Sequence, residues 1–200
     1  GFVSRRAWIW HHTDPDRCGL LPFAFDADFG YRRYAEWALD VPMFFLVRDG
    51  HYRAMDGTTF RTFWRDGHEG ERATLADWDR HLTTLFPEVR MKRIMEVRCA
   101  DAVPMPLLAA APALWKGILY DADARAAAAA LLAIDASERA TVQLDVARRG
   151  LAAGSPRGSV LALCRELAAV AREGLRRQDD PEEASLLDPL DALLERGKSP

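Results

Sequence analysis

The sequence predicts an α+β fold, in which a mixed first half is followed by a layer of helices. Two observations lead to this prediction: short segments bounded by turn residues fill the first half, and helical periods dominate the second. We expect part of an antiparallel sheet, with a hairpin near residues 43–55 and a strand near residues 91–99, followed by the helical layer. The two predicted domains are residues 1–101 and 102–200.

The first half opens with a basic and aromatic segment, Ser4–Trp10, before its first predicted elements. Leu20–Phe25 is predicted to be extended and buried, with Pro22 at an edge or a bend. Tyr31–Leu39 has apolar residues at helical spacing and is predicted to be a helix that ends before Pro42. The aromatic residues expected in the core are Phe23, Phe25, Phe44, Phe45, Phe60, Phe63 and Trp64.

Turn and capping residues define the next elements. The turn Arg48-Asp49-Gly50 predicts a β-hairpin. Thr58 or Thr59 is expected to cap a short helix, and Thr74 a longer one in which Asp77 completes a capping box. The predicted elements are the strands Met43–Val47 and His51–Met55 and the helices Thr58–Trp64 and Thr74–Thr84.

The strand near residues 91–99 alternates between two kinds of side chain. Met95 and Val97 point to one face, whereas Glu96 and Arg98 point to the other, roughly 7 Å apart along the strand. This spacing suits a metal ligand beside a phosphate-binding cation, and it also suits a solvated ion pair on the outer face of a sheet. On the pattern alone, the ion pair is favoured.

The second half is predicted to be helical throughout, with short polar separators between the helices. Alanine dominates the second helix, which indicates high helix propensity. The predicted helices are Pro104–Tyr120, Ala122–Ile134, Ser137–Arg149, Ser159–Arg177 and Ser185–Arg196.

Composition argues against several classes of function. The net charge is −3, so no overall field favours nucleic acid or an anionic membrane surface. No segment resembles a signal peptide or a transmembrane helix, and we expect neither membrane nor nucleic-acid partners. Cys18, Cys99 and Cys164 form no zinc or disulfide spacing, which predicts a reducing, cytoplasmic setting.

Three other groups of polar residues were considered as sites. His11 and His12 precede Asp14 and Asp16 and could form a metal cluster, but the Asp-Pro-Asp run is better explained as a turn. His81 lies near a helix end, where a structural and a functional role are evenly matched. The Arg5-Arg6 pair could hold a carboxylate or simply be part of the surface, and the surface interpretation is preferred. No glycine-rich phosphate loop and no nucleophile motif is present.

Long motifs in order along the chain resemble the C-terminal half of plant and proteobacterial glutamate–cysteine ligases, members of the glutamine-synthetase-like carboxylate–amine ligases. They are DPDRCGLLPFAFDADFGY, YAEWALDVPMFFLVRDG, DWDRHLTTLFPEVRMKRIMEVRCAD and the residues Ala111–Asp121. The HLTTLFPEVR and Glu-x-Arg portions are also similar to an actinobacterial relative that makes γ-glutamylcysteine. The resemblance extends from about Ser4 to Arg177.

The resemblance implies a reaction and roles for individual residues. ATP would phosphorylate the γ-carboxylate of glutamate, and the amine of cysteine would attack the γ-glutamyl phosphate, with Mg²⁺ neutralising the phosphate charge. Glu96 would be a Mg²⁺ ligand, and Arg98 a catalytic residue that contacts ATP and the transferred phosphate. Arg6 would bind the carboxylate of cysteine. Phe44 would line the cysteine pocket, where the family usually has tyrosine.

The chain also departs from the family pattern. Cys99 and Ala102–Met105 stand where plant-type enzymes have a glycine and GGPW, and Cys18 replaces a threonine. The N-terminal half, which brings most acidic metal ligands, is not present, so we expect a second polypeptide, or omitted sequence, to supply it. Two alternatives stay open: a diverged ligase that uses another amine, and a non-catalytic interaction subunit derived from half a ligase.

Overall fold

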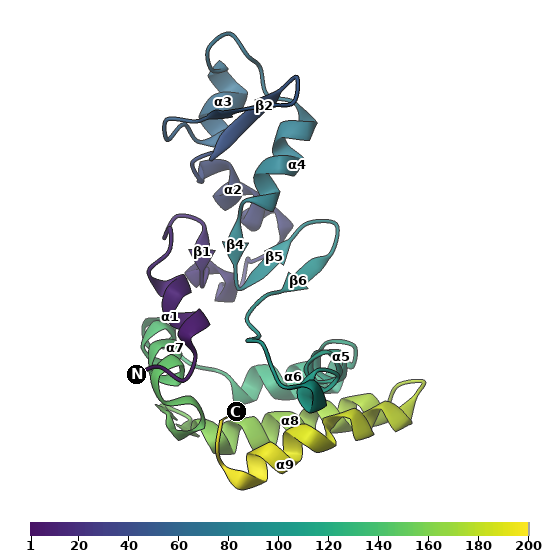
Figure 1. Cartoon of the computed structure of the whole chain (residues 1–200). Coiled ribbons are helices and arrows are strands. Elements are labelled where there is room, and N and C mark those ends of the chain that lie inside the picture. Colours follow the sequence, from purple (N-terminus) through teal and green to yellow (C-terminus); the bar gives the residue numbers. More distant parts are fainter. Residues whose placement is uncertain (200) are drawn as a thin grey trace. The chain divides into compact units, whose positions relative to one another are not determined.

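The computed structural model describes residues 1–199, and the chain divides into two compact units. The mixed unit is Ile9–Cys99, and the helical unit combines Gly1–Trp8 with the chain from Ala100 onward. The α+β prediction is confirmed, because helices and small sheets occur together in the first unit and helices dominate the second (Figure 1). The predicted domain division after Asp101 stays a prediction.

The mixed unit contains three helices of seven or more residues and three two-stranded sheets, among its described elements. The β2–β3 and β5–β6 pairs are antiparallel hairpins, and β1 pairs in parallel with β4. The elements are β1 (Cys18–Gly19), the 3₁₀ helix η1 (Pro22–Phe25), α2 (Tyr31–Asp40), β2 (Phe45–Arg48), β3 (His51–Ala54), α3 (Phe60–Asp66), α4 (Leu75–Thr83), β4 (Phe86–Pro87), β5 (Val89–Met91) and β6 (Met95–Val97).

The helical unit is built from five α-helices and short 3₁₀ turns among its described residues. Helix α1 (Arg5–His11) crosses the boundary between the two units. The other elements are η2 (Met105–Leu107), α5 (Ala110–Leu119), α6 (Ala122–Leu131), α7 (Ala136–Arg149), η3 (Gly150–Ala152), β7 (Gly154–Ser155), β8 (Gly158–Ser159), α8 (Val160–Arg176), η4 (Pro181–Leu187) and α9 (Asp188–Arg196).

The predicted helix starts in the mixed unit are confirmed. The Thr59 side chain accepts a hydrogen bond from the backbone N–H of Thr62 at the start of α3. At the start of α4, Thr74 and Asp77 form the reciprocal capping box, each side chain accepting a bond from the other's backbone N–H. Local chemistry was therefore sufficient to place both helix starts.

Other predictions for this unit were wrong. Leu20–Phe25 is not extended, because its last four residues form η1, in which Pro22 occupies a first-turn position that suits its fixed φ. The strand expected near residues 91–99 is interrupted by a turn at Lys92–Ile94, so it becomes the hairpin β5–β6. Three aromatic side chains expected in the core are exposed: Phe25, Phe44 and Trp64.

The core of the mixed unit lies around α2, α3 and α4. One cluster joins Tyr34 and Ala38 of α2 to Leu85, and a second joins Met43 and Leu46 to Phe60 and Phe63 of α3. Trp78 of α4 packs against both clusters. Helix α4 therefore connects the two apolar clusters, and its ends face both hairpins.

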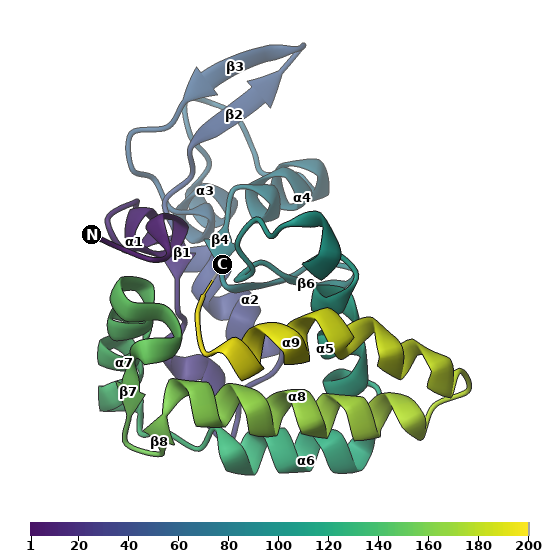
Figure 2. The ribbon, with the colours of Figure 1, turned by 60° about the horizontal axis from the view of Figure 1, so that its bottom comes forward.

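The helical unit is organised around α8, which lies between α6 and α9 (Figure 2). Where α5 crosses α8, Gly117 and Gly174 meet backbone to backbone. A Cβ added at Gly174 would lie 2.0 Å from the carbonyl oxygen of Gly117, and one added at Gly117 would lie 2.2 Å from that of Ala171. Glycine is therefore required on both helices for this close approach.

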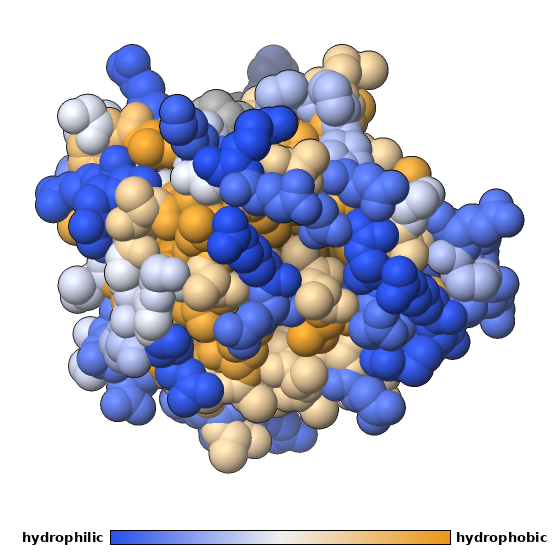
Figure 3. Space-filling model, turned by 90° about the horizontal axis from the view of Figure 1, so that it is seen from below, coloured by the Kyte–Doolittle hydropathy of each residue, from blue (hydrophilic) through white to orange (hydrophobic). Residues whose placement is uncertain are grey.

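The surface of the helical unit mixes apolar and charged groups. In the space-filling view from below, apolar patches are interrupted by hydrophilic side chains (Figure 3). The N-terminal segment packs on α7: the Ser4 amide donates to the carbonyl of Ala147 at 2.9 Å, and the Arg148 guanidinium lies over the Phe2 ring. Within residues 1–199, we find no helix with the length and hydropathy needed to cross a membrane.

Candidate functional site

Two of the predicted site residues lie together on the β5–β6 hairpin. In the register of this hairpin, Arg90 stands directly opposite Glu96, and Arg98 follows Glu96 by two residues. All three side chains consequently lie on one face, because side chains alternate along a strand. The predicted proximity of Glu96 and Arg98 is confirmed, but Arg90, which lies outside the strand pattern predicted for residues 91–99, completes the group. We call Arg90, Glu96 and Arg98 the arginine–glutamate triad.

Both oxygens of Glu96 accept hydrogen bonds from arginine. Arg90 Nε and Nη2 donate to Oε2 at 2.9 and 2.6 Å, and Arg98 Nη1 donates to Oε1 at 2.7 Å. The hydrogen bond from Arg90, followed by the charge of Arg90 and the hydrogen bond from Arg98, holds the pKa of Glu96 below its ordinary value. Glu96 is therefore ionised at neutral pH, and the triad carries a net charge of about +1.

The triad also contacts an aromatic side chain of β4. The guanidinium carbons of Arg98 and Arg90 lie 5.4 and 5.9 Å from the centre of the Phe86 ring, and Trp10 stacks against the same ring at 5.8 Å. Arginines placed over an aromatic face gain a cation–π attraction, and the ring excludes water from one side of the charges. These surroundings suit an anion with delocalised charge.

The triad does not form a complete Mg²⁺ site. Glu96 offers one carboxylate, and both of its oxygens are already engaged by guanidinium groups. Mg²⁺ requires octahedral oxygen coordination, usually with one or two carboxylates. No cluster of three or more His, Cys, Asp or Glu side chains in residues 1–199 could hold a metal. Glu96 thus fits the donation of one ligand at most, and its predicted role stays a prediction.

Phe44, predicted to line a substrate pocket, packs on the buried guanidinium of Arg17. Its ring is 42% exposed, and the Arg17 guanidinium carbon lies 3.5 Å from its centre. Arg17 is only 3% exposed and donates to Asp14 Oδ2 at 2.5 Å and to the carbonyl of Pro42 at 2.8 Å. Phe44 is therefore held in place from behind, with its outer face open to solvent. Its predicted role stays a prediction.

Arg6, predicted to bind a substrate carboxylate, lies in the first turn of α1 and belongs to the helical unit. The helix starts after Ser4, whose hydroxyl accepts a bond from the Ala7 amide at 3.1 Å. The sequence pattern predicted no element here, although Ser4 is of a type favoured at the N-cap and was the signal that could have indicated the helix. Arg6 is thus placed by a helix and not by a loop, and its role stays a prediction.

A groove of about 600 Å³ runs along the same hairpin within the mixed unit. It is lined by Tyr31 and Tyr34 of α2, by Trp78 of α4 and by the hairpin turn with Lys92 and Arg93. The Tyr34 hydroxyl is buried, and burial raises its pKa. The groove combines aromatic walls with two exposed cations at one end.

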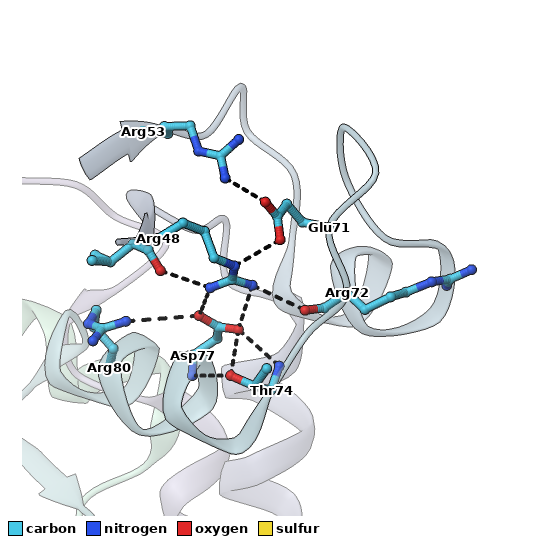
Figure 4. Close-up of polar contacts among 8 residues, drawn as sticks. Arg48, Arg53, Glu71, Arg72, Thr74, Asp77 and Arg80 are labelled. Carbon is cyan, nitrogen blue, oxygen red and sulfur yellow. Dashed lines mark hydrogen bonds and ion pairs between the residues drawn. The ribbon is translucent and has the colours of Figure 1, made fainter. Parts of the chain in front are cut away.

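The most extensive polar network of the mixed unit is structural (Figure 4). Arg48 of β2 donates to Asp77 through Nη1 at 2.7 Å and Nη2 at 3.0 Å, and to Glu71 through Nε at 2.9 Å. Further bonds go to the backbone carbonyls of Val47 and Arg72. Burial tends to raise the pKa of Asp77, but the hydrogen bonds from Arg48 and Thr74 outweigh it, and the net pKa is lowered. We call this group the Arg48 clamp.

The remaining polar candidates have structural explanations. His81 is 3% exposed, and its Nε2 lies 2.8 Å from the Ala38 carbonyl, so it joins α4 to α2. Burial lowers its pKa, which keeps the ring neutral. The Asp14 side chain accepts from the Asp16 amide at 3.1 Å, which confirms the turn interpretation of that run.

Comparison with known proteins identifies relatives along the full chain. Residues 1–200 match the model of glutamate-cysteine ligase family 2 (GCS2). The chain is 40% identical over its whole length to the chloroplastic glutamate–cysteine ligases of Brassica juncea and Arabidopsis thaliana, and covers 40% and 39% of those proteins. It is 53% identical to the Medicago truncatula enzyme over 124 residues, which are 60% of this chain and 24% of that protein.

Two facts follow from these relatives. The chain spans about 40% of the length of the curated relatives that it matches end to end. Those relatives are chloroplastic, which contradicts the cytoplasmic location expected from the cysteines. Cysteines without disulfide spacing indicate a reducing environment. Several cellular compartments are reducing, so the cysteines could not identify which compartment holds the protein.

Proposed function

Because the chain belongs to glutamate-cysteine ligase family 2, we propose that it forms part of an ATP-dependent enzyme that joins the γ-carboxyl of glutamate to the amine of cysteine. The observation that carries this proposal is the family match over residues 1–200, together with 40% identity to plant glutamate–cysteine ligases. Since the chain spans 40% of such a relative, it would supply part of the active site. The rest would come from the portion of the enzyme that the chain does not match.

The proposed chemistry has two steps. The γ-carboxylate of glutamate attacks the γ-phosphorus of ATP, which releases ADP and leaves γ-glutamyl phosphate. The amine of cysteine then attacks the acyl carbon, and phosphate leaves as the peptide bond forms. Negative charge accumulates on the phosphate oxygens in both steps, so cationic groups fixed near them lower the barriers.

Within this chemistry, Arg98 is proposed to contact the transferred phosphate. The support is its place in a triad of net positive charge on a short hairpin, beside an aromatic ring. A guanidinium presents several N–H donors in one plane, which matches the oxygens of a phosphate. Glu96 would orient Arg98 and could offer one oxygen to Mg²⁺, which when bound supplies further charge neutralisation.

Arg6 and Phe44 are proposed to bind the second substrate. Arg6 would hold the carboxylate of cysteine by a charge-assisted bond. Phe44, with its ring fixed on Arg17, would offer an apolar wall to the thiol. Tyrosine is usual at this position in the family, so the pocket would lack a hydroxyl in this chain.

Substitution of Arg98 tests the proposed function. In an enzyme assembled from this chain and the unmatched part of a family ligase, we expect Arg98→Ala to lower kcat for ATP-dependent γ-glutamylcysteine formation by about 10²–10³-fold, as for loss of a transition-state donor. The matched control is Arg93→Ala, which removes an exposed guanidinium from the turn of the same hairpin and should leave kcat unchanged. Normal turnover of Arg98→Ala would show that the assigned role is wrong.

The same assembled enzyme can be used to test two alternative functions. The altered segment Cys99 to Met105 motivates the alternative of a ligase that uses another amine, and ADP release across a panel of amino acids would reveal it. A non-catalytic subunit would instead tolerate simultaneous replacement of Glu96 and Arg98 without loss of activity.

A further inference from the structure

We propose that Arg90 is a positioning residue, which ties the Glu96–Arg98 pair to the C-terminal end of α4 and so sets the direction of the Arg98 guanidinium. This inference deepens the proposed function and rests on it for the phosphate-binding role of Arg98. The connection itself is a matter of geometry within the mixed unit.

The first step is the anchoring of Arg90. Its Nη1 donates to the carbonyl of Thr83 at 2.9 Å and to that of Leu85 at 3.2 Å. Thr83 is the last residue of α4, and the final carbonyls of a helix have no partner within the helix. The guanidinium therefore completes the end of α4 and is fixed there by two rigid backbone groups.

The second step is the use of the two Glu96 oxygens. Arg90 places both of its remaining donor positions, Nε and Nη2, on Oε2, which leaves Oε1 to Arg98. The two donors converge on one oxygen, so they fix the position of Oε2 against the Arg90 guanidinium and leave Oε1 directed at Arg98. The orientation thus passes from the end of α4 to Arg90, then to Glu96, and finally to Arg98.

Exposure shows which of the two arginines is the anchor. The Arg90 side chain is 11% exposed, compared with 20% for Arg98 and 37% for Glu96. The innermost arginine has no outward role to fulfil, because all the bonds just described point to protein groups. Arg98 contributes one bond to Glu96 and lies nearer to solvent, where an anionic substrate would arrive.

Lysine could not replace Arg90 in this role. A single ammonium can approach Glu96 or the two carbonyls, but it cannot hold both in the plane that a guanidinium imposes. Arg90→Lys therefore keeps the charge and removes the orientation, which separates the positioning role from simple electrostatics.

The first experiment measures the connection without any catalysis. In this chain, rotation about the Cζ–Nη bonds of Arg98 is measured by NMR at neutral pH in the unaltered protein and in Arg90→Met. We expect hindered rotation in the unaltered protein and fast rotation in Arg90→Met, because Arg90 supplies two of the three hydrogen bonds that hold Glu96. Equally hindered rotation of Arg98 in folded Arg90→Met would overturn the proposal.

A second variant, Arg90→Lys, covers the case in which Arg90→Met does not fold. It keeps the positive charge beside Glu96 but cannot hold Glu96 and both carbonyls in one plane. We expect the Arg98 guanidinium to rotate fast in this variant also, and hindered rotation in folded Arg90→Lys would contradict the proposal.

The third experiment connects the geometry with turnover. In the assembled enzyme, we expect Arg90→Lys to lower kcat about 10- to 100-fold while the KM values for ATP and glutamate change less than about threefold, as is typical of supporting residues. The control is Arg48→Lys, which alters an equally multivalent arginine and should leave the kcat of folded enzyme unchanged. Normal kcat in Arg90→Lys would reject the positioning role. If Arg98→Ala also kept full activity, the proposed phosphate contact would fail, while the NMR results would still report on the connection.

Discussion

Each of the two units is stabilised internally by a different kind of interaction. In the helical unit, α5 and α8 approach so closely that backbone meets backbone at Gly117 and Gly174, and apolar side chains fill the remaining space. In the mixed unit, small apolar clusters are joined by arginines that each bind several partners: Arg17, Arg48 and Arg90. The helical unit depends on shape, whereas the mixed unit depends on directed hydrogen bonds between charged groups.

This difference determines how each unit should respond to change. A shape-dependent contact tolerates no added volume but is insensitive to pH. A charge-dependent contact tolerates changes of volume but fails when one partner is removed or protonated. Three predictions test this contrast, from the largest expected effect to the smallest.

The largest effect is expected from Gly174→Val in the helical unit. A Cβ at this position already overlaps the carbonyl of Gly117, and a β-branched side chain adds two more methyl groups. We expect the free energy of unfolding to fall by about 4 kcal/mol, at the exceptional end for core overpacking because backbone must move, measured by urea denaturation followed by far-UV circular dichroism. The control is Gly154→Ala, where the nearest atom to an added Cβ is 4.0 Å away. Equal stability of the two variants would mean that the helices do not approach so closely.

An intermediate effect is expected from Arg48→Met in the mixed unit. The substitution keeps much of the side-chain volume but leaves Asp77, whose side chain is 2% exposed, without its main cationic partner. We expect a loss of about 3 kcal/mol in the free energy of unfolding. Arg61→Met is the control, because Arg61 also binds two carboxylates, Glu36 and Asp40, but does so in solvent. A large loss in the control and none in Arg48→Met would reverse the interpretation.

The smallest effect concerns pH and His81. Burial lowers the pKa of this histidine, so the unfolded chain takes up a proton at a higher pH than the folded chain. The free energy of unfolding should therefore fall as the pH drops below about 6.5, by no more than about 1.3 kcal/mol between pH 7 and pH 5.5, the limit that the unfolded chain's ordinary histidine pKa sets. His81→Gln should remove this dependence. The helical unit has no histidine, so its unfolding should not vary over this range.

The sequence predicted the elements that depend on local chemistry. Threonine caps placed α3 and α4, and helical periods located the helices of the second half. The failures have physical reasons. Alternation at residues 91–99 continues through a three-residue turn, so periodicity could not reveal a hairpin. Leu20–Phe25 has the composition of a strand, but proline at the start of a turn decides its conformation.

The candidate site was predictable only in part. Glu96 and Arg98 are two residues apart, and a strand pattern was enough to bring them together. Arg90 pairs with Glu96 across the hairpin, and its bonds to the carbonyls of α4 depend on how the chain returns from that helix. The Arg48 clamp joins residues 23 and 29 positions apart, a separation that no local pattern encodes. The one sequence signal for this network was the position of Arg48 next to a hairpin turn, and an arginine at such a position is usually exposed.

Helix α4 illustrates what these clamps achieve. A helix of nine residues would be mostly unfolded as an isolated peptide, since it would fray from both ends. Here, Arg48 binds Asp77 in the first turn, and Arg90 binds the carbonyl of Thr83 at the last residue. Neither end can unfold without breaking the hydrogen bonds of Arg48 or of Arg90, so the helix cannot unfold one turn at a time. The hairpins at its two ends are therefore linked through a rigid rod about 13 Å long, and local opening in this unit becomes an all-or-none event.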